Sequence, residues 1–158
     1  MIQKAKGSGK KEAATIVEFD PRVIIFACNW CSYSGADLAG TSRYQYAPNV
    51  RIIRVMCSGR VDPSLILKAL RYGADGVLVS GCHPADCHYI NGNQKAEARV
   101  SFLKRFLPHV GIDPRRLRLE WISGSEGELF ARIATTFTEE IRELGPNPLT
   151  GDDIPEVR

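Results

Sequence analysis

The chain contains 158 residues with a formal net charge of +3, from 21 lysines and arginines against 18 aspartates and glutamates. Four lysines lie within the first 11 residues, which hold no acid before Glu12, so the remainder is close to neutral and unlike a nucleic-acid-binding surface. No apolar run is long enough to span a membrane and no secretory signal is present, so we expect a single-domain cytoplasmic protein.

Three regions differ in composition. Residues 1–20 mix lysine, glycine and serine with one short apolar patch, and they predict a flexible N-terminal extension. Residues 21–145 carry alternating apolar and amphipathic segments, and they predict one α/β domain. Residues 146–158 hold three prolines and little apolar content, and they predict a proline-rich C-terminal tail.

Apolar runs within the middle region predict four strands, at 22–27, 51–56, 76–80 and 116–121. The first run is continuous, which favours burial on both faces in a parallel sheet. The last alternates between apolar and polar residues, as a half-exposed edge strand does. Helices are expected between and after these strands, at 31–40, 63–72, 94–107 and about 125–144.

Local signals set the ends and faces of these helices. Asp62 and Pro63 predict an N-cap followed by proline at the first helical position, and Gly73 predicts a C-cap. Ser125 and Glu128 predict a capping box at the start of the last helix. The residues of the third helix that we expect to face inward are Ala98, Phe102, Leu103 and Phe106.

The alternation of strands and helices predicts a single open parallel α/β sheet of about four strands with flanking helices, in the flavodoxin-like order 2-1-3-4. Ligands bind such sheets beyond the carboxyl ends of the strands. Cys28, Cys57 and Cys82 each come within two residues of the end of a predicted strand, and Cys31 and Cys87 follow shortly after. We therefore expect all five cysteines of the chain to converge.

Converging thiols indicate a metal or redox centre, because clustered cysteines in a reducing compartment are usually ligands or redox groups. A CxxC motif such as Cys28-Asn29-Trp30-Cys31 suits zinc, disulfide exchange and iron–sulfur clusters alike. Only an iron–sulfur cluster with four thiolates and a fifth nearby accounts for every cysteine. A dithiol or persulfide oxidoreductase using Cys28 and Cys31, and a zinc-stabilised docking module, stay open as alternatives.

The loop from Gly81 to His88 holds two cysteines and two histidines in eight residues. A Rieske centre would need a histidine directly after the CxxC motif, but Ser32 stands there. We therefore expect His83 and His88 beside the ligands, as hydrogen-bond donors or partner contacts, with plain loop packing an equal alternative. Arg60 is expected to tune the centre by its charge unless it is simply a solvated surface residue.

Four groups of motifs stand out together: CNWCSY at 28–33 with GAD at 35–37, RVMCSGR at 54–60, GADGV at 73–77, and GCH at 81–83 with DCHY at 86–89 and GN at 92–93. Together they resemble the delta, or iron–sulfur D, subunit family of methyl-viologen-reducing hydrogenase. The resemblance covers about residues 23–144 and leaves out only the two ends of the chain.

This resemblance implies a small electron-transfer subunit that carries a [2Fe-2S] cluster and performs no substrate chemistry of its own. It implies that residues 21–145 form an iron–sulfur domain, and that four of five cysteines are cluster ligands, without saying which four: Cys28, Cys31, Cys57, Cys82 and Cys87. The implied partners are a hydrogenase or formate dehydrogenase, and the flavin-bearing, electron-bifurcating A subunit of heterodisulfide reductase in a methanogenesis-type metabolism. No catalytic residue and no contact with nucleic acid or membrane is expected.

Overall fold

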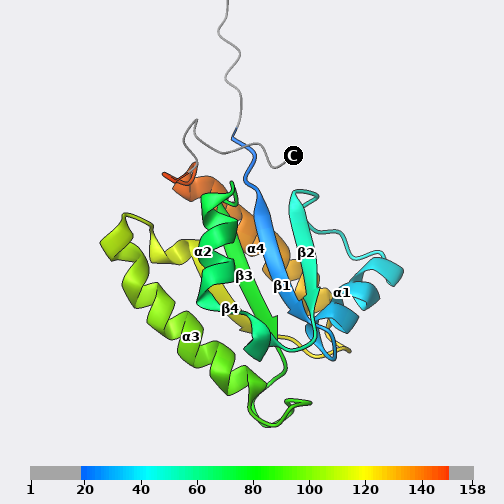
Figure 1. The fold of residues 1–158 in the computed structure, drawn as a ribbon. Helices are drawn as coiled ribbons and strands as arrows, with labels where there is room; N and C mark the ends of the chain where they lie inside the picture. The colour runs from blue at the N-terminus through cyan, green and yellow to red at the C-terminus, as the bar shows by residue number, and fades with distance from the viewer. Residues whose placement is uncertain (1–18, 150–158) are drawn as a thin grey trace, which may run out of the picture.

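A computed structural model describes residues 19–149 and contains one four-stranded sheet (Figure 1). The strands are β1 (Val23–Cys28), β2 (Val50–Val55), β3 (Gly76–Gly81) and β4 (Leu117–Trp121). All neighbouring strands are parallel, in the order β2-β1-β3-β4. The predicted fold class and strand order are both confirmed. Most of the two predicted end regions, residues 1–18 and 150–158, lies outside the described residues.

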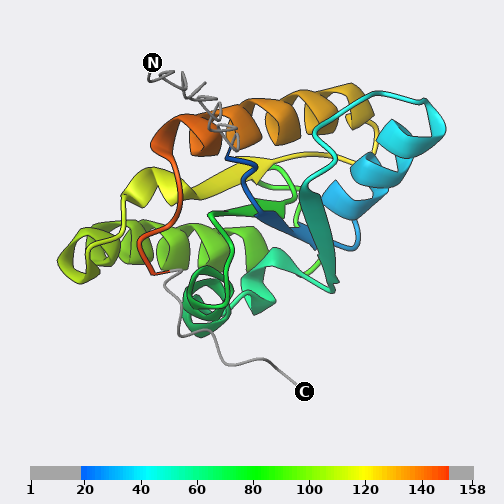
Figure 2. The ribbon, with the colours of Figure 1, turned by 90° about the horizontal axis from the view of Figure 1, so that it is seen from above.

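The helices form a layer on each face of the sheet, so the described part of the chain has three layers (Figure 2). Helices α1 (Ser32–Thr41) and α4 (Gly127–Leu144) cover one face. Helices α2 (Pro63–Arg71) and α3 (Gly92–Phe106) cover the other. Short 3₁₀ turns occur at Ser58–Arg60 (η1), Leu107–Val110 (η2) and Pro114–Arg116 (η3). No helix among residues 19–149 is long and apolar enough to cross a membrane.

Strand β3 lies at the centre of both cores, and all six of its residues are buried. Leu78 packs with α1 and α4, whereas Val77 and Val79 pack with α2 and α3. Side chains of a strand point alternately to opposite faces, so a run with no polar gap is what burial on both faces requires. The continuous apolarity of β1 has the same cause, with Ile25 on one face and Phe26 on the other.

The predicted start of α2 is confirmed. The Asp62 carboxylate accepts a hydrogen bond of 2.9 Å from the Ser64 backbone N–H, and Pro63 is the first helical residue. Because a proline has no N–H, it loses nothing at a position where that donor would have no intrahelical partner. The helix ends before Gly73, whose φ of +104° is readily adopted only by glycine.

The predicted inward face of α3 is wrong in part. Phe102 and Phe106 are 57% and 40% exposed, and Ala98 is also exposed, while Leu103 is buried as predicted. The residues that face the sheet follow the spacing of one helical stripe and are Ala96, Val100, Leu103 and Leu107. The helix carries two apolar stripes, and the one with the smaller side chains allows the closer approach to the sheet.

The predicted capping box of α4 is also wrong. The helix begins at Gly127, and its N-cap position is held by Glu126 without a side-chain capping bond. The Glu126 carboxylate instead accepts a 2.7 Å hydrogen bond from the Ser123 backbone N–H. Ile133, Phe137 and Ile141 recur at every fourth position of the helix and are buried, and Leu129 packs against them partly buried.

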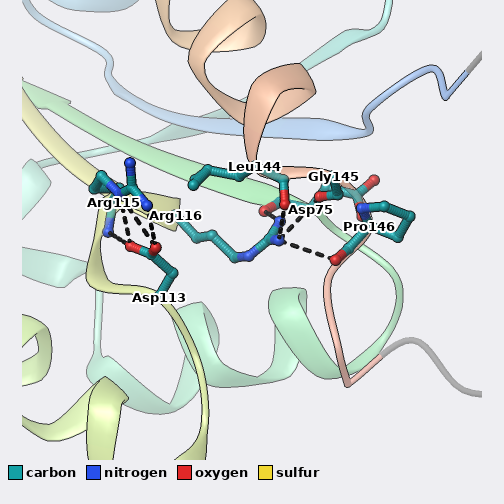
Figure 3. Close-up of polar contacts among 7 residues, drawn as sticks. All are labelled: Asp75, Asp113, Arg115, Arg116, Leu144, Gly145 and Pro146. Carbon is teal, nitrogen blue, oxygen red and sulfur yellow. Dashed lines mark hydrogen bonds and ion pairs between the residues drawn. The ribbon is translucent and has the colours of Figure 1, made fainter.

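The amino-terminal edge of the sheet is closed by Arg116 (Figure 3). Its guanidinium is buried and donates to backbone carbonyls on both sides of it: those of Asp75, Leu144, Gly145 and Pro146. The Asp75 carboxylate in turn accepts from the backbone N–H groups of Arg22 and Asn147. The chain that leaves α4 is therefore fastened to the edge opposite the cysteines.

Candidate metal centre

Three cysteines meet at the carboxyl edge of the sheet. Cys28 is the last residue of β1, Cys82 directly follows β3, and Cys31 is the N-cap residue of α1. The Sγ atoms of Cys31 and Cys82 are 3.0 Å apart, those of Cys28 and Cys82 are 3.9 Å apart, and all three lie within 4.8 Å of one another. None of the three residues is more than 7% exposed. We call these three residues the cysteine triad.

The triad follows from the parallel pairing of β1 and β3. Ala27 lies opposite Ser80, so the residues that leave the two strands start side by side. The chain after Cys28 then turns tightly, with the Cys31 N–H bonded to the Cys28 carbonyl at 3.4 Å. This turn returns the second thiol of the CxxC motif to the first. Two adjacent strand ends and one turn are therefore sufficient to assemble three thiols.

Cys57 and Cys87 lie together beside the triad and pack against Gly92. A methyl group at Gly92 would overlap the Cys57 sulfur and lie 3.2 Å from the Cys87 sulfur. The absence of a side chain at the start of α3 therefore makes room for both thiols. Both are buried, and the charge of Cys28 reaches Cys57 strongly enough to affect its pKa.

The thiols of the triad differ in acidity because they share hydrogen bonds. A hydrogen bond from Cys31 lowers the pKa of Cys28 to about 5, and the same bond raises the pKa of Cys31 above its usual range. Burial raises the pKa of Cys82 and of Cys57. Burial also opposes ionisation of Cys87, but backbone N–H groups, with that of Asn93 foremost, outweigh it and lower the pKa. Thiolate is the form that binds metals.

The two histidines of the loop make specific contacts outside the triad. His83 Nε2 lies 2.7 Å from Glu126 Oε2, and this bond, with the one from Ser123, lowers the pKa of Glu126 to about 2. The His88 ring stacks on Trp30 with centroids 3.9 Å apart and an interplanar angle of 16°. Trp30 Nε1 donates to the Tyr89 hydroxyl at 3.2 Å. Each histidine thus helps to fix the loop around Cys82 and Cys87.

A pocket of about 330 Å³ opens beside Cys57. The predicted residue Arg60 lies on its wall, exposed, and its backbone N–H bonds to the Cys57 carbonyl. The other residues that line this pocket are Met56, Gly59, Tyr89, Asn91, Gly92 and Lys95. Its lining contains two cationic side chains and no carboxylate.

Two buried hydroxyl groups near this edge have no hydrogen-bond partner among residues 19–149. They belong to Ser58 and Ser80, which are 1% and 0% exposed. Buried polar groups are normally satisfied, so an orphaned hydroxyl indicates a partner that the polypeptide itself does not supply. Five gathered thiols with unused donors fit an iron–sulfur group, whose sulfurs accept hydrogen bonds.

Three residues of this site could not be recognised from the sequence. In the sequence, Gly92 is notable only as part of the GN motif, and no pattern indicates a function for Ser58 or Ser80. Their importance depends on contacts between residues far apart in the sequence. Gly92, for example, packs against Cys57, which lies 35 positions earlier in the chain. The nearest signal in the sequence is the direct adjacency of Ser58 to Cys57.

The fold and the site define a class: a parallel α/β domain with a cysteine-lined centre at the carboxyl edge of its sheet. The chain belongs to the family described as the methyl-viologen-reducing hydrogenase delta subunit, whose model matches residues 23–145.

Three relatives illustrate the family. The chain is 55% identical over 129 residues to the F420-non-reducing hydrogenase iron–sulfur D subunit of Archaeoglobus profundus, covering 82% of this chain and 94% of the relative. It is 52% identical over 128 residues to the vhc iron–sulfur D subunit of the same kind of hydrogenase in Methanococcus voltae, covering 81% and 89%. It is also 52% identical over 126 residues to the A subunit of the ferredoxin:CoB-CoM heterodisulfide reductase of Methanosarcina mazei, covering 80% of this chain but only 16% of that relative.

Proposed function

We propose that this protein is an electron-transfer subunit carrying a [2Fe-2S] cluster between a hydrogenase, or a formate dehydrogenase, and a flavin-bearing heterodisulfide reductase that bifurcates electrons. The observation that carries the proposal is the buried cysteine triad, whose sulfurs lie within 4.8 Å of one another with two further thiols alongside. The names of the hydrogenase relatives, which call them iron–sulfur subunits, support it.

Cys28, Cys31 and Cys82 would supply three ligands, and either Cys57 or Cys87 the fourth. Four thiolates are the usual complement for such a cluster, so one of these last two thiols stays unligated. When bound, the cluster takes up and gives back one electron at a time. The chain's own part is to hold the thiolates, bury them from water and present one side of the site to a partner.

The partners are supported by how the family is distributed. One set of relatives consists of hydrogenase subunits that the match covers almost completely, whereas another carries a matching segment within the much longer A subunit of a heterodisulfide reductase. A domain found both as a separate hydrogenase subunit and inside a reductase chain is suited to connect the two enzymes.

A dithiol oxidoreductase at Cys28 and Cys31 is the second candidate. The lowered pKa of Cys28, held by a hydrogen bond from Cys31, is the observation that favours it, because a CxxC thiolate of this kind attacks disulfides. This candidate leaves Cys57, Cys82 and Cys87 without a role. It predicts that Cys57→Ala has full dithiol activity.

The test is metal and sulfide analysis of anaerobically purified and reconstituted protein. The proposal predicts about two irons and two sulfides per chain, as the [2Fe-2S] formula requires, and a rhombic electron-spin resonance signal after reduction. Triad variants such as Cys82→Ala should lose both. Uptake of zinc but no iron would contradict the proposal and favour a zinc-stabilised docking module.

The two candidates for the fourth ligand can be separated with single variants. Of Cys57→Ala and Cys87→Ala, one should abolish cluster binding and the other should leave the iron content intact. Full iron content in both variants would contradict the four-thiolate arrangement unless the two thiols replace each other. The double variant decides that case, because it must then lose the cluster.

A further inference from the structure

We propose that the Ser58 hydroxyl donates a hydrogen bond to a sulfur atom of the iron–sulfur centre and thereby raises its reduction potential. This inference rests on the proposed function and deepens it, since it assigns a role to a side chain that lies among the cysteines but is not a ligand. Its starting point is the orphaned Ser58 Oγ, which is fully enclosed and has no partner among the described residues.

An orphaned buried hydroxyl is costly. Leaving such a group without a hydrogen bond forfeits the bond it would make to water, and that loss destabilises the folded chain. An alanine at this position would avoid that cost at nearly the same volume. A serine here therefore indicates an acceptor that is present in the working protein.

The position of Ser58 points to the acceptor. Ser58 directly follows Cys57, and its backbone N–H group is directed at the Cys28 sulfur, where it helps to lower the pKa of that thiol. Its hydroxyl lies against Gly81, the residue before Cys82, so closely that a methyl group at Gly81 would be 2.6 Å from Ser58 Oγ. Ser58 is therefore next to Cys57 in the chain, reaches Cys28 through its backbone N–H, and packs against the residue before Cys82.

The sign of the effect follows from charge. Reduction adds one negative charge to the iron–sulfur group, and a hydrogen-bond donor stabilises the more negative form more strongly. Loss of the hydroxyl should therefore shift the potential to more negative values. Ser80 is a weaker candidate, because it stands within β3 opposite Ala27, whereas Ser58 directly follows the candidate ligand Cys57 and its backbone N–H reaches Cys28.

The experiment compares Ser58→Ala with wild-type protein and with Ser101→Ala, an exposed serine on α3 that serves as the matched control. Each protein is loaded anaerobically and titrated potentiometrically with electron-spin resonance as the readout. We expect Ser58→Ala to hold the same iron and sulfide but to have a more negative potential, whereas Ser101→Ala matches wild type. Resonance Raman spectra in H₂O and D₂O should show an exchange-sensitive iron–sulfur band that Ser58→Ala lacks.

An unchanged potential and an unchanged deuterium effect in loaded Ser58→Ala would overturn the inference. If that variant does not hold the cluster, Ser58→Thr, which keeps a hydroxyl, takes its place and should retain the deuterium-sensitive band; loss of that band in loaded Ser58→Thr would overturn the inference equally. The failure of the proposed function looks different, because wild-type protein would then bind no iron and sulfide at all.

Discussion

Buried cysteines are common, since an unmodified cysteine behaves as a small apolar side chain. Burial alone therefore says little about Cys28, Cys31 and Cys82. Their distinguishing feature is sulfur–sulfur contact at 3.0–3.9 Å combined with opposite pKa shifts at Cys28 and Cys31. Apolar packing explains neither observation, because it requires no sulfur to be placed beside another.

Arg116, at the end of the sheet opposite the cysteines, contributes to the stability of the fold through its buried hydrogen bonds. Arg116→Met should lower the free energy of unfolding by on the order of 3 kcal/mol, because it leaves the buried Asp75 carbonyl and three partly buried carbonyls at the end of α4 without a donor. Urea denaturation would measure the change. Arg115→Met is the control, since the Arg115 side chain is 70% exposed and pairs with Asp113. Equal effects of the two substitutions would contradict this role for Arg116.

The contact between His83 and Glu126 gives a prediction about acid. The folded pKa of Glu126 is about 2, whereas an unfolded glutamate titrates near pH ~4.3. A folded pKa below the unfolded one gives stability that is present above the unfolded value and is lost as the pH falls through the folded value. Metal-free wild-type protein should therefore exceed Glu126→Gln in stability at about pH 6, and the two should converge between about pH 4.3 and 2. A difference that does not vary with pH would refute this coupling.

At the scale of elements, the start of α3 is fitted around two thiols. Gly92→Ala should lose most of its iron and sulfide after reconstitution, because the new methyl group would displace the Cys57 sulfur and crowd the Cys87 sulfur, and one of these two is the proposed fourth ligand. Overpacking of this kind also costs about 1–3 kcal/mol of stability. Colorimetric iron and sulfide assays would measure the loss.

The matched control for Gly92→Ala is Gly40→Ala in α1, where a methyl group meets no atom within 4 Å. Alanine is the better helix former, so this variant should load normally and be no less stable. Normal iron content in Gly92→Ala would show that Cys57 and Cys87 can move apart without consequence for the site.

The sheet could be predicted from the sequence because its evidence is local. Continuous apolar runs mark β1 and β3, and the pairing of parallel strands brings the residues that follow them to one edge. The inward face of α3 could not be predicted, since Phe102 and Val100 present rival apolar stripes and only the spacing to the sheet decides between them. The capping box failed because Glu126 bonds to Ser123 and His83.

At the scale of the whole molecule, the two ends of the sheet serve different purposes. The amino end is held by Arg116, Asp75 and Asn147, and the carboxyl end carries the thiols and an exposed apolar rim. The rim consists of Trp30, Met56, Tyr89 and Ile90, which are 46–86% exposed. A surface of this composition beside the gathered thiols is suited to contact with a partner protein.

Ile90 gives the sharpest test of that contact. It is 86% exposed and has a φ of +71°, a conformation that is unfavourable for a β-branched residue. An exposed isoleucine with this backbone conformation does not stabilise the folded chain. We therefore expect the Ile90 side chain to contact a partner protein. Ile90→Asp should not lower stability, because aspartate tolerates a positive φ better than isoleucine, and should leave iron content unchanged, but should weaken binding to the A subunit of a heterodisulfide reductase roughly tenfold or more.

A suitable probe is the Methanosarcina mazei reductase A subunit with the segment that matches this chain removed, so that the loaded protein can take its place. Biolayer interferometry would compare wild type, Ile90→Asp and Val110→Asp, a control that changes another exposed apolar residue just beyond the far end of α3. Binding of wild type and Val110→Asp with equal affinity, and weaker binding of Ile90→Asp, would identify the rim as the reductase contact. Equal weakening by both substitutions would instead indicate a general effect of charge, and unchanged binding of Ile90→Asp would exclude the rim from the reductase interface.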